Sequence, residues 1–276
     1  MLYKQFLELF DILDSASASG AQVVEYFKSI VPDCKVETYP LNGPKGHTDM
    51  VRLMVPGKNG KTNGGTAKTL GILGRLGGLG ARPERIGFVS DGDGALVALA
   101  VGAKLLDMQK KGDFLEGDVF ISTHVCPDAP TAPHDPVPFM NSPVETWQVN
   151  KEEVTDALDA VLVVDTTKGN RIINHRGFAI SPTVRQGYIL RVSEDLLDIM
   201  QTTTGRLPQV FALTQQDITP YGNGLYHLNS ILQPATATKA PVVGVAITTE
   251  TMVAGCATGA MHLEDMEDAA RFMLET

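Results

Sequence analysis

Acids and histidines recur along the chain at places where a hydrolytic metal site would need them. They stand in four short stretches: Gly46-His47-Thr48-Asp49, Ser90-Asp91-Gly92, His124-Val125-Cys126-Pro127-Asp128 and Val164-Asp165. Carboxylate oxygens offset the charge of a divalent cation, and a neutral imidazole nitrogen offers it a directional lone pair. Each stretch alone is degenerate, so their order along the chain carries the argument for a metal centre.

Strand and helix patterns take turns along most of the chain and would position these residues. Strands are expected at 35–39, 50–55, 86–90, 119–125, 160–165, 209–214 and 242–248, and helices before residue 30 and at 94–111, 151–158, 193–200 and 263–274. This alternation predicts an α/β fold in three layers, with a mostly parallel mixed sheet covered by helices on both faces. Because no internal repeat or linker interrupts it, we expect a single domain over residues 1–276.

Three of the acids fall where ligands collect in such folds. Open α/β sheets bind ligands beyond the carboxyl ends of their strands. Asp91, Asp128 and Asp165 each lie at or just past an expected strand end, so they should meet in one crevice. His47 and Asp49 come just before an expected strand and follow this rule less simply.

Composition narrows the classes of partner. The chain has 276 residues, a formal charge of −9 and a pI near 5.1, so it lacks the surplus of Lys and Arg that binds a nucleic-acid backbone. Three unrelated cysteines (Cys34, Cys126 and Cys256) favour a reducing compartment, and we expect a cytoplasmic protein. The first ten residues predict an amphipathic helix rather than a signal peptide, and no apolar run is long enough for a membrane span.

The motifs resemble those of the co-catalytic zinc aminopeptidases and carboxypeptidases. Residues 46–51 are similar to their Gly-His-x-Asp-x-Val ligand motif, and residues 91–99 to their bridging aspartate at the start of a helix of small residues. Residues 117–128 resemble the strand that ends in their Glu-Glu pair, and residues 165–167 resemble their later ligand aspartate. The resemblance implies a zinc-exopeptidase-like fold that binds Zn²⁺ or another divalent metal.

On this resemblance, each candidate receives a role. His47, Asp91, Asp128 and Asp165 would be metal ligands, and Asp49 would orient the ring of His47. The candidate for proton transfer is His124. Simpler interpretations stay open, because Asp91 is also placed to cap a helix and His124 to be a hydrogen-bonded core histidine.

The chain departs from the peptidase pattern at two positions. Pro127 stands where those enzymes have the glutamate that acts as general base, and proline can move no proton. Their last ligand histidine should fall near Gly255 or Cys256, where this chain has none. His227 and His262 are the two candidates to replace it.

A closer resemblance covers nearly the whole chain but implies no chemistry. Residues 74–85 and 217–224 resemble segments of a prokaryotic family known only as a domain of unknown function. This resemblance supports the fold without choosing among activities.

A second motif competes with the metal site. Residues 55–62 follow a strand and resemble the phosphate loop of amide-bond-forming ligases, in which Lys61 would neutralise phosphate charge. Asn63-Gly64-Gly65 is a poor start for the helix that such a loop requires, since glycine disfavours helix. A glycine-rich loop without a nucleotide is the simpler interpretation.

These observations favour a metal-dependent hydrolase of a small amide or peptide-like substrate. The enzymatic alternative is a nucleotide-dependent ligase that uses the Gly60-Lys61-Thr62 loop. The other alternative is a non-catalytic, oligomer-forming relative that kept the scaffold and lost its base, which Pro127 favours. The expected partners are a small-molecule or short peptide-like substrate and further copies of the chain, with no nucleic acid and no membrane.

Overall fold

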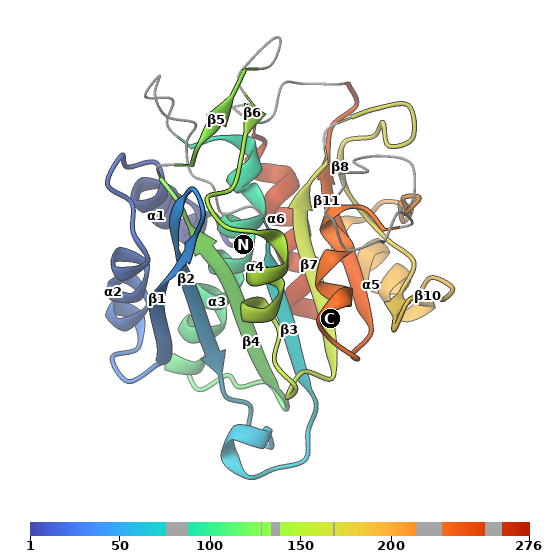
Figure 1. Ribbon diagram of the computed structural model, residues 1–276. Coiled ribbons are helices and arrows are strands. Elements are labelled where there is room, and N and C mark those ends of the chain that lie inside the picture. Colours follow the sequence, from blue (N-terminus) through green and yellow to red (C-terminus); the bar gives the residue numbers. More distant parts are fainter. Residues whose placement is uncertain (76–87, 128, 134–138, 168, 214–227, 252–260) are drawn as a thin grey trace.

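A single large sheet organises the molecule. The computed structural model describes residues 1–75, 88–127, 129–133, 139–167, 169–213, 228–251 and 261–276. Within this part of the chain nine strands form one sheet in the order β1-β2-β4-β3-β7-β11-β9-β10, with β8 also paired to β11 (Figure 1). A separate pair of short strands, β5 and β6, stands beyond one edge of the sheet.

The described elements have the following bounds. The helices are α1 (Tyr3–Leu13), α2 (Gly20–Ile30), α3 (Asp93–Lys110), α4 (Thr146–Glu153), α5 (Glu194–Thr204) and α6 (Leu263–Glu275), with 3-10 helices η1 (Lys61–Asn63), η2 (Ser90–Gly92) and η3 (Ser230–Thr236). The strands are β1 (Lys35–Gly43), β2 (Gly46–Val55), β3 (Thr69–Gly74), β4 (Asp118–Val125), β5 (Thr131–Ala132), β6 (Phe139–Met140), β7 (Ala160–Thr166), β8 (Gly177–Ile180), β9 (Val184–Arg185), β10 (Tyr188–Ile189) and β11 (Val242–Thr248). Within the described ranges every helix is too short or too polar to span a bilayer.

The centre of the sheet is parallel and its margins are antiparallel. β3 pairs in parallel with β4 and β7, and β7 pairs in parallel with β11. The β1–β2 hairpin joins β4 antiparallel, while β8 and β9 run antiparallel to β11. The ends of β3, β4, β7 and β11 therefore share one edge with the start of β2. We call this the carboxyl edge, and the opposite one the amino edge.

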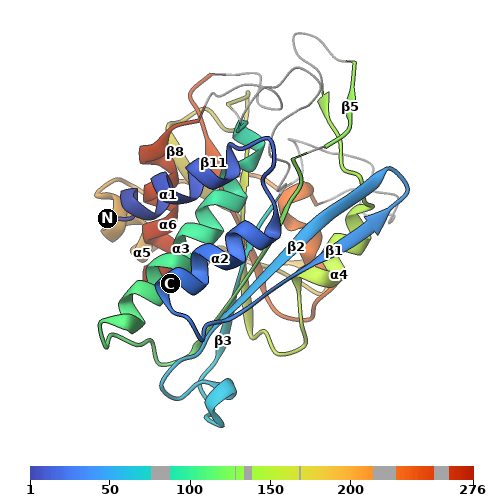
Figure 2. The same ribbon diagram turned by 90° about the vertical axis from the view of Figure 1, so that its left-hand side faces the viewer.

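Two apolar cores lie on the two faces of the sheet. Helices α1, α2, α3 and α6 cover one face, which we call the α3 face, around a core that includes Phe6, Phe27 and Phe272 (Figure 2). The other face, the α4 face, packs beneath α4 and η3 around Phe120, Phe211 and Ile231. Strand residues alternate between the two cores. This confirms the prediction of a mostly parallel mixed sheet with helices on both faces.

Helix α3 is the central helix of the α3 face, and its start lies against the carboxyl edge. Residues 93–103 are all buried, which suits a segment that after Asp93 is built from alanine, valine, leucine and glycine. Gly94 must be glycine, because a β-carbon there would lie 2.5 Å from the carbonyl oxygen of Val164. The first turn of α3 is therefore fixed directly against the end of β7.

The structure corrects several predicted elements. The strand β3 was not predicted at all, and the predicted helix at 151–158 instead occupies 146–153, where Glu145 and Gln148 form a capping box. Of the strand predicted at 209–214, residue 214 lies outside the described residues, and residues 209–213 form only a bridge between Val210 and Ile180. Of the strand predicted at 86–90, residues 86–87 lie outside the described residues and Ser90 begins η2.

Candidate functional site

Three polar side chains form a row across the α4 face at the carboxyl edge. Ser122 pairs with Leu73 and Gly74 with Val164, and the amide of Arg75 donates to Val164 O at 2.9 Å. Extending this register aligns His124 with Arg75 and Arg75 with Asp165. Neighbouring strands lie about 4.8 Å apart, so the three residues fall within about 10 Å. We call His124, Arg75 and Asp165 the edge row.

The members of the edge row leave the sheet on the same face and are all buried. His124, Arg75 and Asp165 are 6%, 4% and 1% exposed. Their faces follow from alternation, since Phe120, Leu73 and Val163 belong to the core under α4 and each lies an even number of residues away. Such a concentration of buried polar groups at strand ends is typical of functional sites in α/β proteins.

The hydrogen bonds of His124 define its tautomer. Its Nδ1 lies 2.8 Å from Thr48 Oγ1, and the Thr48 hydroxyl donates to the carbonyl oxygen of Val125 at 3.1 Å. Because that hydroxyl has one proton and Val125 O can only accept, His124 Nδ1 must donate to Thr48. The lone pair of the ring is therefore on Nε2, the atom through which imidazole accepts a proton or binds a metal.

The imidazole of His124 is held neutral. Burial, together with the smaller effect of the positive charge of Arg75, lowers its pKa to about 3. A histidine with so low a pKa does not retain a proton near neutral pH. Its Nε2 is consequently suited to accept a hydrogen bond or to bind a cation more than to store a proton.

Arg75 is anchored from helix α4. Its Nη1 donates to Asn150 Oδ1 at 2.9 Å and also contacts Glu153 Oε2. Glu153 is fully buried; burial raises its pKa, and the Arg75 guanidinium opposes that rise. The Arg75–Glu153 ion pair thus fixes the central cation of the edge row and connects it to the last turn of α4.

Two further acids lie at the start of α3, at the same edge of the sheet as the edge row. A β-carbon at Gly94 would lie 2.5 Å from Val164 O and 3.0 Å from Arg75 O, so this turn lies against the ends of β7 and β3. Asp93, the first residue of α3, is fully buried, while Asp91 in η2 is partly exposed. Asp93 is thus a stronger candidate by burial than the predicted Asp91.

The sequence predicted that His47 and Asp49 come just before a strand, but both residues lie inside β2. His47 is exposed, and Asp49 Oδ2 accepts a hydrogen bond from the amide of Gly20 at 2.9 Å, at the start of α2. Met50 is paired with His124, so residues 47 and 49 point to the opposite face from His124. The structure brings His47 to the carboxyl edge but not beside His124.

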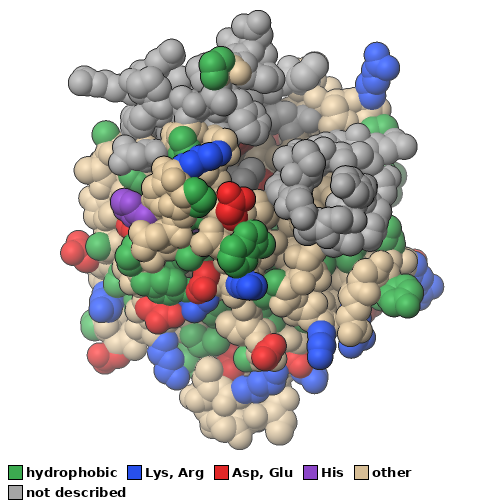
Figure 3. All heavy atoms as spheres, in the orientation of Figure 1, with side chains coloured by type: hydrophobic (Ala, Val, Ile, Leu, Met, Phe, Trp, Pro, Cys, Tyr) green, Lys and Arg blue, Asp and Glu red, His purple; other side chains and the backbone are tan. Residues whose placement is uncertain are grey.

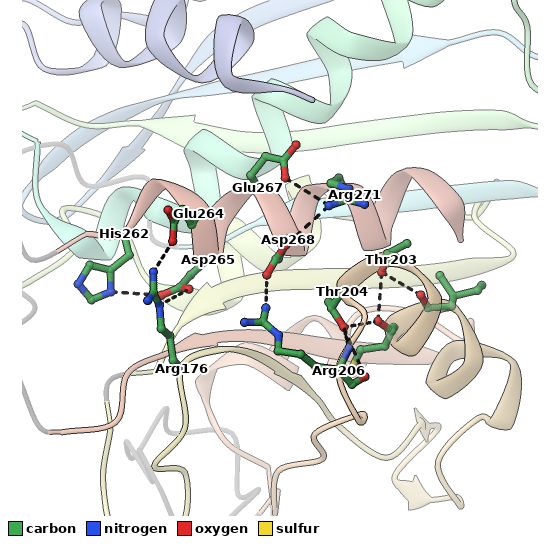
Figure 4. Close-up of polar contacts among 12 residues, drawn as sticks. Arg176, Thr203, Thr204, Arg206, His262, Glu264, Asp265, Glu267, Asp268 and Arg271 are labelled. Atoms are coloured by element: carbon green, nitrogen blue, oxygen red, sulfur yellow. Dashed lines mark hydrogen bonds and ion pairs between the residues drawn. The ribbon is translucent and has the colours of Figure 1, made fainter.

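Of the remaining predicted ligands, only His262 lies in the part of the chain that the structure describes. Asp128 and His227 lie outside the described residues. His262 stands just before α6, with Nδ1 3.1 Å from Asp265 Oδ2, and Arg176 binds both Asp265 and Glu264 (Figure 4). In the same view Arg206 binds Asp268 and Arg271 lies near Glu267, so this cluster fastens α6 by ion pairs. The ligand roles of Asp128, His227 and His262 stay predictions.

The donor types at the carboxyl edge fit a divalent cation, although the described ligand set is incomplete. Buried carboxylates at positions 93 and 165 and an imidazole with Nε2 as acceptor match the chemistry of zinc and manganese sites. Among the described residues, no group of three His, Cys, Asp or Glu side chains is arranged to hold a metal ion. A complete site would need ligands from the segments that the structure does not describe.

The phosphate-loop motif lies at the amino edge and is filled by an internal carboxylate. Asp118 accepts hydrogen bonds from the amides of Gly57 and Thr62, each at 2.9 Å, and from the Thr62 hydroxyl at 2.8 Å. A β-carbon at Gly60 would lie 1.8 Å from Asp118 Oδ1. The Lys61 ammonium donates to Ala157 O at 2.8 Å and pairs with Asp159. These donors are therefore already hydrogen-bonded within the chain and are not free to bind phosphate. This argues against the nucleotide-dependent ligase.

Three residues of the candidate site were missed by sequence reasoning. Arg75 stands in a glycine-rich run, and Glu153 fell near the start of a helix that was predicted five residues too late. Asp91 was chosen as the candidate ligand instead of Asp93. The capping box at Glu145 and Gln148 was the available signal for α4, since it begins the helix five residues earlier. The burial of Arg75 follows only from the pairing of β3.

Comparisons with known proteins agree with this architecture. The family described as "Protein of unknown function (DUF1177)" matches residues 40–276. The structure is similar to the LapA aminopeptidase of Legionella pneumophila, with a TM-score of 0.56, 10% identity, and coverage of 99% of this chain and 69% of that one. It is also similar to a mutant of tomato leucine aminopeptidase, with a TM-score of 0.57, 10% identity, and coverage of 100% and 61%. A search of curated proteins gives no match.

These likenesses establish the fold and nothing finer. The chain has the zinc-exopeptidase-like α/β fold that its motifs predicted, and both resemblances stated from the sequence are confirmed. It spans less than two thirds of the tomato enzyme. At 10% identity, the activity of those aminopeptidases does not transfer to this chain with the fold.

Proposed function

The chain belongs to the DUF1177 family, and we propose that its carboxyl edge hydrolyses a small amide or peptide-like substrate with the help of a divalent metal ion. The observation that carries the proposal is the edge row, in which a neutral imidazole, an anchored guanidinium and a buried carboxylate share one face at the strand ends. The zinc-exopeptidase-like fold supports the same location.

Acids at the carboxyl edge would hold the metal. Asp165 and the acids at the start of α3 would supply anionic oxygens, and His47 and Asp128 would complete the ligand set expected from the sequence. A divalent ion bound there would polarise a substrate carbonyl and lower the pKa of water. Zn²⁺ is the first ion to test, because carboxylate and imidazole donors both suit it.

The residues of the edge row would then divide the remaining tasks. His124 Nε2 would accept a hydrogen bond from the attacking water or from the substrate amide, since its low pKa leaves it unprotonated. Arg75, held by Glu153 and Asn150, would supply fixed positive charge beside the oxygen that becomes negative during the reaction. Glu153 and Asn150 would be positioning residues that act through Arg75.

Metal analysis tests this proposal. The native protein, purified without chelator, should contain about one or two ions per chain, as single-ion and two-metal hydrolases do. Asp165→Asn should lose metal while keeping its melting temperature near that of the native protein after its metal has been removed by chelator. The matched control is Asp159→Asn at the amino edge, where the acid pairs with Lys61 and Lys68, and this variant should keep the metal.

A non-catalytic scaffold is the second candidate, and Pro127 is the observation that favours it. Proline stands where the peptidase general base is expected, and its side chain can move no proton. A fully folded native protein that contains no metal and takes up no added Zn²⁺ would support the scaffold and contradict the hydrolase.

A further inference from the structure

Exposed apolar side chains gather at one margin of the sheet. Tyr188 is 74% exposed and Leu207 77%, and Ile189, Leu190 and Val210 are also exposed. All five lie on or beside the segments that flank β8 and β9 on the side away from β11, because β10 pairs with β9 and Val210 bridges Ile180. The other large exposed apolar residues of the described chain belong to separate elements. Exposed apolar side chains gathered at the margin of a sheet mark a candidate interaction surface.

Figures 1 and 3 locate this margin in the same orientation. β10 stands at the right of the ribbon, at the end of the strand order and away from the centre of the sheet. The space-filling view shows hydrophobic side chains at that place, with Lys or Arg side chains beside them (Figure 3). The hairpin formed by β9 and β10 therefore offers apolar side chains to the surroundings of the molecule.

The turn of this hairpin fixes which backbone groups point outward. Gln186 and Gly187 have φ of 50° and 83°, the left-handed pair typical of a two-residue type I′ turn. Tyr188 pairs with Arg185, and the amide of Leu190 donates to Thr183 O at 2.8 Å. Because backbone groups alternate along a strand, the N–H and C=O of Ile189 point away from β9. β10 is thus an edge strand with outward hydrogen-bonding groups between apolar side chains.

The charges beside β10 carry both signs. Arg191 follows the strand, and Glu194 and Asp195 begin α5; all three are exposed and make no ion pair with another described residue. A surface with one sign would call for a partner of the other sign. Charges of both signs instead suit a two-fold interface, in which the same surface meets itself.

We infer that a second copy of this chain docks on this margin, with β10 of one copy pairing antiparallel to β10 of the other about a two-fold axis. In the register centred on Ile189, the two Ile189 residues exchange both N–H···O bonds. Tyr188 of each copy then lies beside Leu190 of the other on one face of the joined sheet, and the two Ile189 side chains lie beside each other on the opposite face. The two sheets become one continuous sheet across the dimer.

The first test is the mass of the protein in solution. Sedimentation equilibrium of the native chain should give a dimer, twice the 29.6 kDa of the chain. Tyr188→Lys/Ile189→Lys should give a monomer with the native circular dichroism spectrum, because both side chains are solvent-facing in the single chain. The control Leu7→Lys, which replaces an apolar residue exposed to 57% on α1, should stay dimeric. A monomeric native protein, or a dimer that survives the double substitution, would overturn the inference.

Cysteine cross-linking tests the register and does not depend on the charged variants folding. Directly opposed residues of a hydrogen-bonded antiparallel pair have Cα atoms about 5.5 Å apart, within the range a disulfide spans. Oxidised Ile189→Cys should therefore form a covalent dimer, whereas Tyr188→Cys, which faces Leu190, should not. Equal cross-linking of both variants, or none with Ile189→Cys, would contradict the proposed pairing.

Discussion

Asp118 and Asp165 are both buried aspartates at the ends of parallel strands, yet the two edges of the sheet use them differently. Asp118, at the start of β4, receives three hydrogen bonds from Gly57 and Thr62 of its own neighbouring loop. Asp165, at the end of β7, lies in a row with Arg75 and His124 and beside the first turn of α3. The amino edge closes around its carboxylate, whereas the carboxyl edge assembles several charged groups from different elements.

This difference shows that a phosphate-loop motif is informative only when the acceptors bound to its backbone amides are known. The Gly57–Thr62 segment presents backbone donors as such loops do, but an acid of the same chain binds them. The motif at the carboxyl edge is less regular in sequence, yet it collects residues from β3, β4, β7, α3 and α4. Convergence of separate elements is the better indicator of chemistry here.

Among substitutions at the carboxyl edge, we expect replacement of Glu153 to destabilise the protein most. Glu153→Ala removes the buried carboxylate that neutralises Arg75, so we expect the free energy of unfolding to fall by about 3–5 kcal/mol. Urea denaturation followed by circular dichroism measures the change. The double variant Arg75→Met/Glu153→Leu should recover most of the loss, because it replaces the pair by apolar groups. A double variant no more stable than Glu153→Ala would contradict this account.

Replacing Asp118 tests the amino edge by the same measurement, the free energy of unfolding. Asp118→Ala leaves the buried amides of Gly57 and Thr62 without their acceptor, which should cost about 1–3 kcal/mol of the free energy of unfolding. Burial raises the pKa of Asp118, but hydrogen bonds from Gly57 and Thr62 outweigh it and the net pKa is lowered. The stabilisation is therefore present above about pH 4 and is lost as the pH falls through the lowered pKa. Asp118→Asn should lack this acid-dependent loss in urea melts recorded across that range.

The lowered pKa of His124 predicts that the stability of the carboxyl edge depends on pH. Its pKa is lowered to about 3 in the folded protein, while the unfolded chain takes up the proton near pH 6.5. The unfolded state thus binds more protons between these values, and stability should fall as the pH drops through the window, by about 1.4 kcal/mol per pH unit for one proton. The difference between the native protein and His124→Gln isolates this slope. NMR of the imidazole nitrogens should show a neutral ring protonated on Nδ1 at pH 5.

Lys61 should have the smallest effect. It is partly exposed and pairs with Asp159 at the surface, so Lys61→Met should change the free energy of unfolding by less than about 1 kcal/mol. ATP should not raise the melting temperature of the native protein or of this variant. A clear ATP-dependent rise that Lys61→Met removes would restore the ligase alternative.

The order of strands and helices was largely predictable, because β4, β7, β11, α3 and α6 are built from long apolar patterns with the expected period. β3, which contains Gly71 and Gly74, was not predicted. The structure shows the packing reason: β-carbons there would lie 2.8 Å from Leu158 and 2.6 Å from the carbonyl of Gly94. Glycine in this strand serves close packing.

The candidate site was predictable as a location but not as a set of contacts. Acids after strands indicated the carboxyl edge, and the structure places Asp165 and the start of α3 at that edge. The partnership of Arg75 with Glu153 joins residues 78 positions apart and depends on the register of an unpredicted strand. The face taken by His47 likewise follows from the β2–β4 pairing, which no local pattern specifies.

Peptide hydrolysis by matched variants of the two edges tests the central claim most directly. The zinc-loaded native protein and Asp118→Asn should release the amino-terminal residue of an unblocked tripeptide with similar kcat/KM. Asp165→Asn should lower kcat/KM by about 10²-fold or more, the scale of losing one group that stabilises the transition state. Equal kcat/KM for the native protein and Asp165→Asn, or an equal loss in both variants, would contradict the assignment of the chemistry to the carboxyl edge.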